Sequence, residues 1–236
     1  RAYPSTKFLP KPLFKVDGKT LLLKNIEILI NEFKVKEIFI VVGHLSDSII
    51  NYINGLNLDT KITFISQKKI NGIANALLLL KEKLNKKKFI VILADEYYHN
   101  PNHSKLLNKI SNDFSCILTF INEPNKNIVS KNFIGNFEKD RIVSLKEKPL
   151  NPNTSLMGVG TYFFDESIFE YIEKTNFSKL RNEREITDVI SNMAKNKKIG
   201  YQVIDCKYFN ISNRSDLITA NYYVRDNNFD NKKISL

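Results

Sequence analysis

The chain has no tryptophan, only two cysteines among 236 residues, and no apolar run long enough to span a bilayer. Cys116 and Cys206 are too few for a disulfide framework, and neither has the spacing of a zinc site. Each lies in an apolar, strand-like run, so we expect two buried free thiols. The start of the chain does not resemble a secretory leader. These absences predict a soluble, cytoplasmic protein with no membrane partner.

Arginine is scarce although the chain is basic. The 36 basic and 25 acidic residues give a net charge of +11, but only six of the basic residues are Arg. Bidentate phosphate contacts favour Arg, and the lysines are scattered apart from short clusters such as 85–88. We therefore interpret most of the charge as solvated surface. A nucleic-acid-binding protein, with strongly salt-dependent binding, stays open as an alternative class.

Proline is unusually frequent at the beginning. The chain contains seven prolines, and three of them lie in the opening segment 1–16, RAYPSTKFLPKPLFKV. Proline fixes φ and removes a backbone donor, so this segment cannot form a helix interior or a central strand. We expect a stiff, extended loop that presents Arg1, Lys7, Lys11 and Lys15.

After this loop, apolar runs of strand type alternate with segments of helical periodicity. The expected strands are 37–43, 61–66, 88–95 and 115–121, and the expected helices are 20–34, 46–53, 71–84 and 103–110. Thr20 and Ser46 are the expected N-caps of the first two helices. Because several strands are continuously apolar, they predict an α/β fold with a mostly parallel, mixed sheet flanked by helices.

The second half has a mixed α+β pattern. It predicts a hairpin over 132–149, strands at 157–164 and 199–205, and helices at 165–174, 183–195 and 215–226. No linker or repeat marks a boundary, so we predict a single domain, 1–236, with a smaller α+β part toward its end. Tyr222 and Tyr223 on the closing helix suit either a homo-oligomer contact or the core.

Asp95 is the first candidate for chemistry, because it ends the expected strand 88–95. In a doubly wound sheet, ligands bind at the carboxyl ends of the strands, and an Asp there suits Mg²⁺ on phosphate oxygens. A turn or capping role is equally consistent with its position. Gln67 and Gly72 are weaker candidates: Gln67 follows a strand, and Gly72 allows close backbone approach beside a helix start.

Glu147 and Lys148 place an acid beside a base at a strand end, before Pro149. Neighbours in a regular strand point to opposite faces, so both could face one ligand only if the strand bent. Taken alone, an exposed charged strand end explains them better. His99 and His103 are four residues apart, but an intervening proline breaks any helix. We expect capping or surface roles for them rather than a metal pair.

Six segments occur in the order and at the approximate spacing found in sugar-1-phosphate nucleotidylyltransferases. They are RAYPSTKFLPKPLFKV, EIFIVVGHLSDSI, SQKKINGIANAL, VILADEYY, RIVSLKEKP and YFNISNRSDLITAN. The chain resembles this family over nearly its whole length, and most closely its glucose-1-phosphate thymidylyl- and uridylyltransferase-like group. The resemblance implies a Rossmann-like nucleotide-binding part over about residues 1–125 and a sugar-phosphate-binding part over about residues 126–236.

The resemblance also implies a reaction. A nucleotidyl group passes from an NTP, with dTTP or UTP favoured, to a sugar 1-phosphate, and pyrophosphate is released. Catalysis of this kind needs positioning and charge neutralisation rather than a covalent intermediate. Arg1 resembles the Arg that closes the family's glycine-rich phosphate loop, and Lys11 the Lys beside the reacting phosphates. Asp95 would bind Mg²⁺, the implied cofactor.

Other matching positions would bind the substrates. Gln67 would hydrogen-bond the edge of the base, and the Gly72 backbone would lie against it. Lys148 would hold the sugar phosphate, Glu147 would bind a sugar hydroxyl, and Gly135 would pack against the sugar. These contacts fit uracil and thymine equally, and a phosphorylated alcohol in place of the sugar stays open.

Three features depart from the family pattern. The family's second metal-binding Asp aligns near Asn210, whose carbonyl can ligate Mg²⁺ but carries no charge. The Gly expected two residues later is Ser212. The glycine-rich loop and a first central strand should precede Arg1, so we expect the natural chain to continue before it.

Two alternatives follow. Asn210 slightly favours a non-catalytic relative that binds nucleotide sugars, whereas Arg1, Lys11, Asp95 and Lys148 favour an enzyme. A cytidylyl- or guanylyltransferase acting on another phosphorylated substrate is the other alternative. The expected partners are an NTP and a sugar 1-phosphate, and neither nucleic acid nor a membrane.

Overall fold

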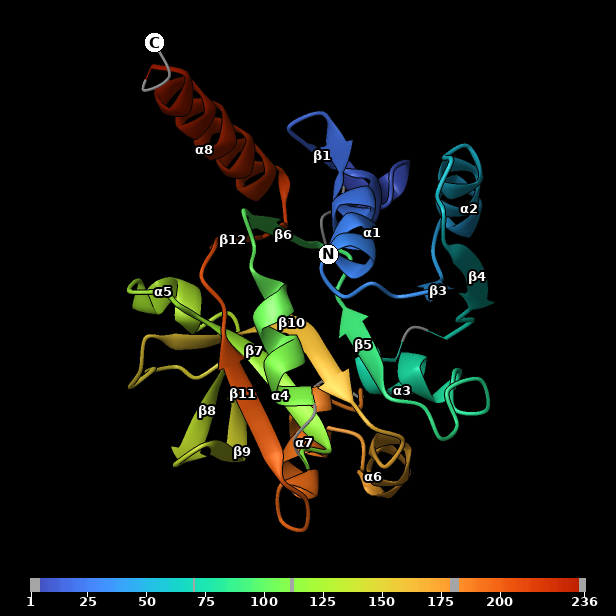
Figure 1. Ribbon diagram of the computed structural model, residues 1–236, viewed down its shortest axis with the longest axis vertical. Helices are drawn as coiled ribbons and strands as arrows, with labels where there is room; N and C mark the ends of the chain where they lie inside the picture. The colour runs from blue at the N-terminus through green and yellow to red at the C-terminus, as the bar shows by residue number, and fades with distance from the viewer. Residues whose placement is uncertain (1–4, 70, 111–112, 179–182, 234–236) are drawn as a thin grey trace. The chain divides into compact units, whose positions relative to one another are not determined.

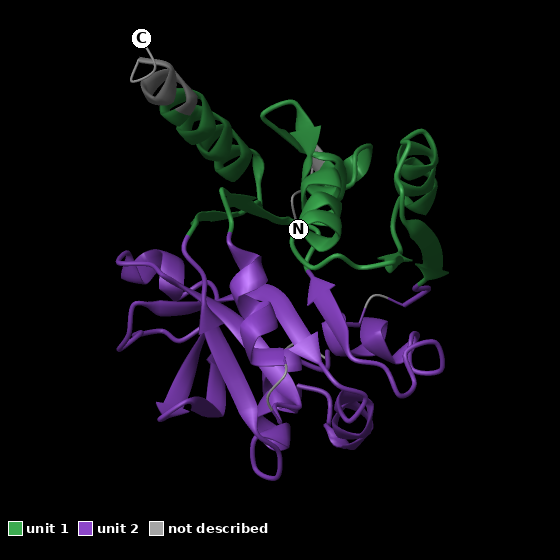
Figure 2. Ribbon diagram, viewed as in Figure 1, with its two compact units in different colours: residues 1–66, 93–101, 206–236 green, residues 67–92, 102–205 purple. Residues whose placement is uncertain are grey.

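The computed structural model describes residues 5–69, 71–110, 113–178 and 183–233. The chain forms two compact units, each built from separate stretches of sequence (Figure 2). Unit 1 comprises residues 1–66, 93–101 and 206–236, and unit 2 comprises residues 67–92 and 102–205. No helix in the described ranges is both long and apolar enough to cross a membrane.

In its described residues, unit 1 combines short strands with three α-helices. Its elements are the 3₁₀ turns η1 (Ser5–Lys7) and η2 (Lys11–Leu13), the strands β1 (Lys15–Val16), β2 (Lys19–Thr20), β3 (Glu37–Val42), β4 (Lys61–Ser66), β6 (Glu96–His99) and β12 (Lys207–Asn210), and the helices α1 (Leu21–Asn31), α2 (Ser46–Asn54) and α8 (Arg214–Lys233). β3 and β4 pair in parallel, whereas β6 and β12 pair antiparallel.

Unit 2 contains a six-stranded sheet in the order β5-β10-β7-β11-β9-β8 (Figure 1). Its elements are the strands β5 (Phe89–Ile92), β7 (Cys116–Asn122), β8 (Phe133–Glu138), β9 (Arg141–Glu147), β10 (Leu156–Phe164) and β11 (Ile199–Val203), the turn η3 (His103–Leu106), and the helices α3 (Ile73–Leu78), α4 (Leu107–Ile110), α5 (Lys126–Val129), α6 (Ile168–Lys174) and α7 (Ile186–Met193). β7 pairs with β11 in parallel, and β10 runs antiparallel to β5 and β7. The predicted α/β class with a mixed sheet is confirmed.

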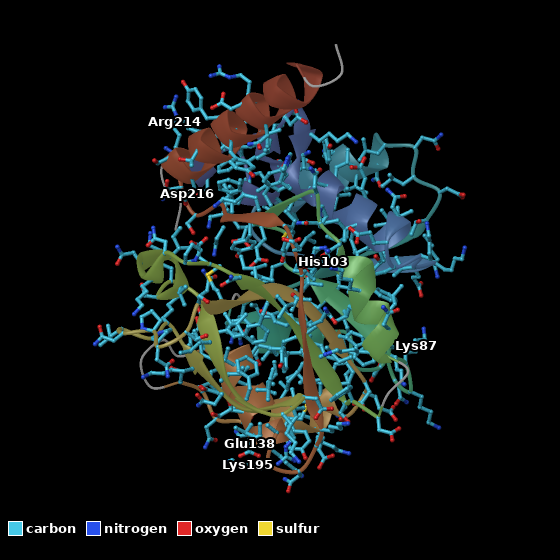
Figure 3. All side chains as sticks on the ribbon, turned by 60° about the vertical axis from the view of Figure 1, so that its left-hand side comes forward. Lys87, His103, Glu138, Lys195, Arg214 and Asp216 are labelled. Carbon is cyan, nitrogen blue, oxygen red and sulfur yellow. The ribbon has the colours of Figure 1, made fainter. Side chains whose placement is uncertain are left out.

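The central strands of unit 2 are apolar for a physical reason. All residues of β7 except Asn122 are buried, and so are all residues of β10 except Leu156. A strand that is covered on both faces cannot alternate apolar and polar side chains. Helices α6 and α7 pack against each other, and α7 also packs against β9. Figure 3 shows the charged residues Lys87, Glu138 and Lys195 at the exposed periphery, as expected for a solvated charge.

Unit 1 has its own core, in which α8 packs against the beginning of the chain. The core residues are Phe14, Val16, Leu21, Tyr97, Ile211, Ala220 and Val224. Tyr223 packs against this cluster, whereas the side chain of Tyr222 is 55% exposed. The core therefore anchors the segment after Lys11 and the strands β6 and β12 to one helix.

Some local expectations were wrong. The opening segment is not uniformly extended: η1 and η2 are 3₁₀ turns, which Pro12 permits because a helix's first turn needs no internal donor. Ser46 does not cap α2, because Leu45 precedes the helix with a φ of 56° and no side chain caps the first turn. Helix α3 is shorter than expected, since the backbone after Leu78 continues in turns such as the one closed by the hydrogen bond from Leu80 N to Leu77 O.

The predicted cap of α1 is confirmed. The Thr20 hydroxyl accepts a hydrogen bond from Leu23 N at 3.1 Å.

Candidate active site

Lys11 and Asp95 form an ion pair inside unit 1. The Lys11 Nζ lies 3.6 Å from an Asp95 carboxylate oxygen, and the two side chains are 19% and 40% exposed. Lys11 begins η2 between two prolines, and the turn is closed by a hydrogen bond from Phe14 N to Lys11 O at 2.9 Å. A half-buried cation beside a more open carboxylate suits a phosphate and a metal ion that bind together.

Asp95 does not end the strand itself, because β5 ends at Ile92. It lies in the turn that leads into β6. Asn25 on α1 reaches this turn: its Nδ2 donates to Leu93 O and to Glu96 O, each at 3.1 Å. These carbonyls flank Asp95, so one side chain holds the backbone on both sides of the candidate ligand. Sequence reasoning missed Asn25, because its partners lie about 70 positions away.

Asn210 lies beside Asp95 along the backbone. It ends β12 opposite Glu96, and the next residue, Ile211, donates its N–H to Asp95 O at 3.0 Å. The Asn210 Oδ1 accepts a hydrogen bond from the Ser212 hydroxyl at 3.1 Å. Ser212, where the resemblance predicts a Gly, therefore uses part of the hydrogen-bonding and coordinating capacity of this oxygen. The structure thus places Lys11 in contact with Asp95 at one end of β6 and β12, where Asn210 pairs with Glu96 and therefore lies on the same face of the strand pair as that residue.

Glu96, the second carboxylate in this turn, is turned inward. Its side chain is 4% exposed and accepts a hydrogen bond from the Tyr98 hydroxyl. Tyr208 on β12 lies nearby, and burial, followed by the Glu96 carboxylate, raises the pKa of its hydroxyl well above the ordinary value. Of the two adjacent carboxylates, Asp95 is therefore the one open to a ligand.

The oxygen donors at this place fit Mg²⁺ only in part. Among the described residues, no group of three or more His, Cys, Asp or Glu side chains is placed to hold a metal ion. Mg²⁺ is usually bound by one or two carboxylates together with substrate phosphates and water, rather than by a full protein cage. Asp95 supplies one such carboxylate, and a second oxygen donor from Asn210 stays a prediction. The site therefore suits a metal ion that binds together with its phosphate ligand.

Gln67 and Gly72 lie at the two ends of a short connection in unit 2. The Gln67 Nε2 donates to the Asn71 Oδ1 at 3.4 Å, and Gly72 precedes α3 with a φ of 99°. A Cβ at Gly72 would lie 2.9 Å from the Arg184 backbone oxygen. The close approach at Gly72 is to the segment around Arg184, which accounts for the glycine, and its contact with a nucleotide base stays a prediction.

Arg184 braces this connection through side chains as well. Its Nη1 donates to the Asn75 Oδ1 at 3.2 Å, and the Asn75 Nδ2 donates to Asn71 O at 2.7 Å. The guanidinium also lies over the Phe177 ring, 4.7 Å from its centroid. A chain of contacts thus runs from Phe177 and Arg184 through Asn75 to Asn71, the residue that binds Gln67.

Lys148 takes a left-handed backbone conformation at the end of β9. Its φ is 45°, and its N–H donates to Asn132 O at 2.7 Å. The strand therefore bends before Pro149, which is the condition for Glu147 and Lys148 to face one ligand, and the Lys148 Nζ lies 4.0 Å from the Glu147 Oε1. Six other non-glycine residues in the described ranges also have a positive φ, so this conformation shows a bend and does not by itself mark a ligand site. The bend gives Glu147 and Lys148 the geometry to face one ligand.

Gly135 lies in β8 opposite Leu145 and is buried. A Cβ on Gly135 would lie 2.8 Å from the Phe137 ring and 3.3 Å from the Phe120 ring. The aromatic packing of the sheet thus accounts for the glycine. Its contact with a sugar stays a prediction.

The other candidates divide as follows. Arg1 lies outside the described residues. His103 is fully buried, with its Nε2 3.2 Å from the Thr161 hydroxyl, so the expected surface or capping role is wrong (Figure 3). His99 contacts the Tyr97 hydroxyl through Nδ1 at 3.1 Å. The ligand-binding roles of all the site residues remain predictions.

The chain belongs to the nucleotidyl transferase family, whose family model matches residues 1–227. This confirms the family that the sequence motifs predicted. The bifunctional protein GlmU of Methanocaldococcus jannaschii is 30% identical over 226 residues, which cover 96% of this chain and 52% of that protein. A glucose-1-phosphate thymidylyltransferase of Streptomyces griseus is 26% identical over 228 residues, covering 95% of this chain and 62% of that protein.

The chain thus spans about half the length of the curated relatives that it matches. Among solved structures, UDP-glucose pyrophosphorylase complexed with UDP-glucose matches with a TM-score of 0.82 at 23% identity. The match covers 95% of this chain and 94% of that chain. At this level of identity, the likeness shows a shared fold.

Proposed function

We propose that the protein transfers a nucleotidyl group from an NTP, dTTP or UTP by preference, to a sugar 1-phosphate and releases pyrophosphate. The observation that carries the proposal is the Lys11–Asp95 pair, 3.6 Å apart, with Asn210 beside it. It combines a cation for phosphate oxygens with carboxylate and amide oxygens for a metal ion. Family membership and the names of the relatives support the same reaction.

The chemistry requires no nucleophile from the protein. A phosphate oxygen of the sugar 1-phosphate forms a bond to the α-phosphorus of the NTP. The bond between that phosphorus and the oxygen bridging to the β-phosphate breaks, and the electron pair leaves with pyrophosphate. Negative charge grows on the leaving oxygens, and Lys11 would stabilise it in the transition state.

Asp95 and the Asn210 carbonyl would hold Mg²⁺. When bound, this ion supplies positive charge to the phosphate oxygens and orients them for in-line displacement. Lys11, now paired with Asp95, would bind the phosphate oxygens beside that carboxylate. The open side chain of Asp95 and the inward Glu96 support this assignment.

The candidates in unit 2 would select the substrates. Gln67 would hydrogen-bond the base edge, with Gly72 allowing the base to approach the backbone. The bend at Lys148 supports binding of the sugar phosphate by its ammonium group and of a sugar hydroxyl by Glu147. Uracil and thymine present the same edge to an amide, so both UTP and dTTP belong to the proposal.

The test is a full matrix of NTPs and sugar 1-phosphates with the full-length protein and Mg²⁺, read out by pyrophosphate release and by the mass of the product. Release that depends on one pair, with a nucleotide sugar as product, supports the proposal. An NTP that raises the melting temperature without release from any pair would point instead to a non-catalytic nucleotide-binding relative. Pyrophosphate release with CTP or GTP and another phosphorylated alcohol would identify a cytidylyl- or guanylyltransferase with a different acceptor.

A further inference from the structure

Asn25 is the least expected polar residue near the candidate metal site. It lies on the inner face of α1, and its side chain is 2% exposed. Its Nδ2 donates to the carbonyls of Leu93 and Glu96, as described above. Its Oδ1 is also buried and has no hydrogen-bond partner among the residues that the structure describes.

Asparagine at this position has both a cost and a gain in stability. Its buried amide oxygen without a partner is unfavourable; an apolar side chain of similar size would avoid that cost but would leave the carbonyls of Leu93 and Glu96 without this donor. The gain therefore comes from the two donated bonds, which both end on the turn that carries Asp95. Together with the bond from Ile211 N to Asp95 O, they hold three carbonyls of this turn.

The same helix also fixes the other member of the ion pair. Leu21 N, at the start of α1, donates to Phe14 O at 2.9 Å, and Phe14 N donates to Lys11 O. One rigid helix thus ties the Lys11 turn to the Asp95 turn. A shift of either turn would change the 3.6 Å separation of the two charged groups.

We propose that Asn25 is a positioning residue for the transfer reaction: it holds the Asp95 turn so that the carboxylate stays beside Lys11 and open to the metal and the phosphates. This inference rests on the proposed function. Asn25 touches neither substrate, so its loss should lower kcat and leave both KM values nearly unchanged. Displacing a catalytic group by about 1 Å can cost up to ~100-fold in rate.

The chain offers a closely matched control. The Nδ2 of Asn221 in unit 1 also donates to two carbonyls, Lys15 O at 3.1 Å and Leu217 O at 3.0 Å, but neither belongs to the Asp95 turn. The experiment compares Asn25→Ala, Asn25→Ser and Asn221→Ala. It measures kcat, both KM values, the melting temperature and, in the metal-free protein, hydrogen exchange of the Ile211 amide that bonds to Asp95 O.

For Asn25→Ala we expect kcat to fall about 10- to 100-fold, with both KM values within about threefold of wild type. Ile211 exchange should become faster in this variant and not in Asn221→Ala, which should keep kcat within about twofold of wild type. Asn25→Ser keeps one donor and should lie between the two. In the Asp95→Asn background, Asn25→Ala should lower kcat little further, because both changes act through one side chain.

Three results would overturn the inference while leaving the proposed function in place. The first is an equal loss of kcat in Asn25→Ala and Asn221→Ala. The second is a double variant of Asn25→Ala and Asp95→Asn whose fold-loss in kcat equals the product of the two single losses. The third is loss of the fold in both Asn25 variants, which would make the role purely structural. If the wild-type protein releases no pyrophosphate with any substrate pair, the proposed function fails and the inference fails with it.

Discussion

The two units place their candidate residues by different means. In unit 1, opposite charges are in contact, and the core of Phe14, Leu21 and Ile211 anchors their turns. In unit 2, the backbone determines the geometry, because Gly72 has a φ of 99° and Lys148 a φ of 45°. Charged groups stabilise the transition state at phosphates, whereas a fixed backbone holds binding groups in the position that selects a substrate. We therefore expect substitutions in unit 1 to change turnover and substitutions in unit 2 to change substrate affinity.

The largest effect is expected for Asp95→Asn, which removes a metal-binding charge but preserves shape. Because metal-assisted charge stabilisation is worth several kcal/mol, kcat should fall roughly a thousandfold. The melting temperature should change little, since the side chain is 40% exposed. The control is Asp59→Asn, an exposed aspartate of the same unit. A loss of NTP affinity with unchanged kcat would contradict a catalytic role for unit 1.

Lys11→Met should have the next largest effect, because it removes the cation but keeps an unbranched side chain. Loss of one preorganised group that stabilises the transition state costs about 100-fold in kcat. Pyrophosphate release at saturating substrates measures it. Lys7→Met, at an exposed lysine in η1, should behave like wild type. Equal behaviour of the two variants would show that general positive charge, rather than the Lys11–Asp95 geometry, matters.

Gly72→Ala tests recognition in unit 2. The new Cβ would lie 2.9 Å from Arg184 O, at a φ and ψ of 99° and 165° that only glycine adopts readily. A local cost of about 1–3 kcal/mol should raise the KM for the NTP about tenfold or more, without a matching fall in kcat. Gly55→Ala is the control, since φ is −80° and the nearest atoms lie at 3.5 Å. A fall in kcat with an unchanged KM for the NTP would contradict the expectation that substitutions in unit 2 change substrate affinity.

Arg184→Met should have a smaller effect of the same kind. The loss of its hydrogen bond to Asn75 is worth about 1 kcal/mol, which corresponds to about a fivefold rise in the KM for the NTP. The KM for the sugar phosphate should stay constant. Arg141→Met is the control, because Arg141 is exposed and pairs only with Glu138 among the contacts seen for it. An equal rise in both KM values would mean that Arg184 has a general structural role.

The smallest effect is expected for Asn210→Asp, which adds a charge at the second oxygen donor. The Mg²⁺ concentration for half-maximal turnover should fall about threefold, because a carboxylate binds Mg²⁺ more tightly than an amide oxygen. Asn127→Asp on α5 adds the same charge to an exposed position of unit 2 and controls for net charge. An unchanged Mg²⁺ requirement would remove Asn210 from the metal site.

The sequence predicted the elements whose signals are local. The continuous apolar runs of β7 and β10 and the Thr20 cap each depend on neighbouring residues. The wrong prediction of a Ser46 cap and the missed role of Asn25 also share a cause. The left-handed Leu45 displaces Ser46 from the cap, and Asn25 acts on carbonyls about 70 positions away, so neither is visible in a local pattern. Motif resemblance supplied the site residues, whereas tertiary contacts revealed what holds Asp95.

The proposed reaction needs charge and position from the protein but no nucleophile. The most direct test is the configuration at the α-phosphorus after turnover of a single diastereomer of the α-thio NTP, using the pair that the substrate matrix selects. Direct attack by the sugar phosphate is a single in-line displacement, so the account predicts inversion. Retention would reveal two displacements and a covalent nucleotidyl–protein intermediate, and would contradict it.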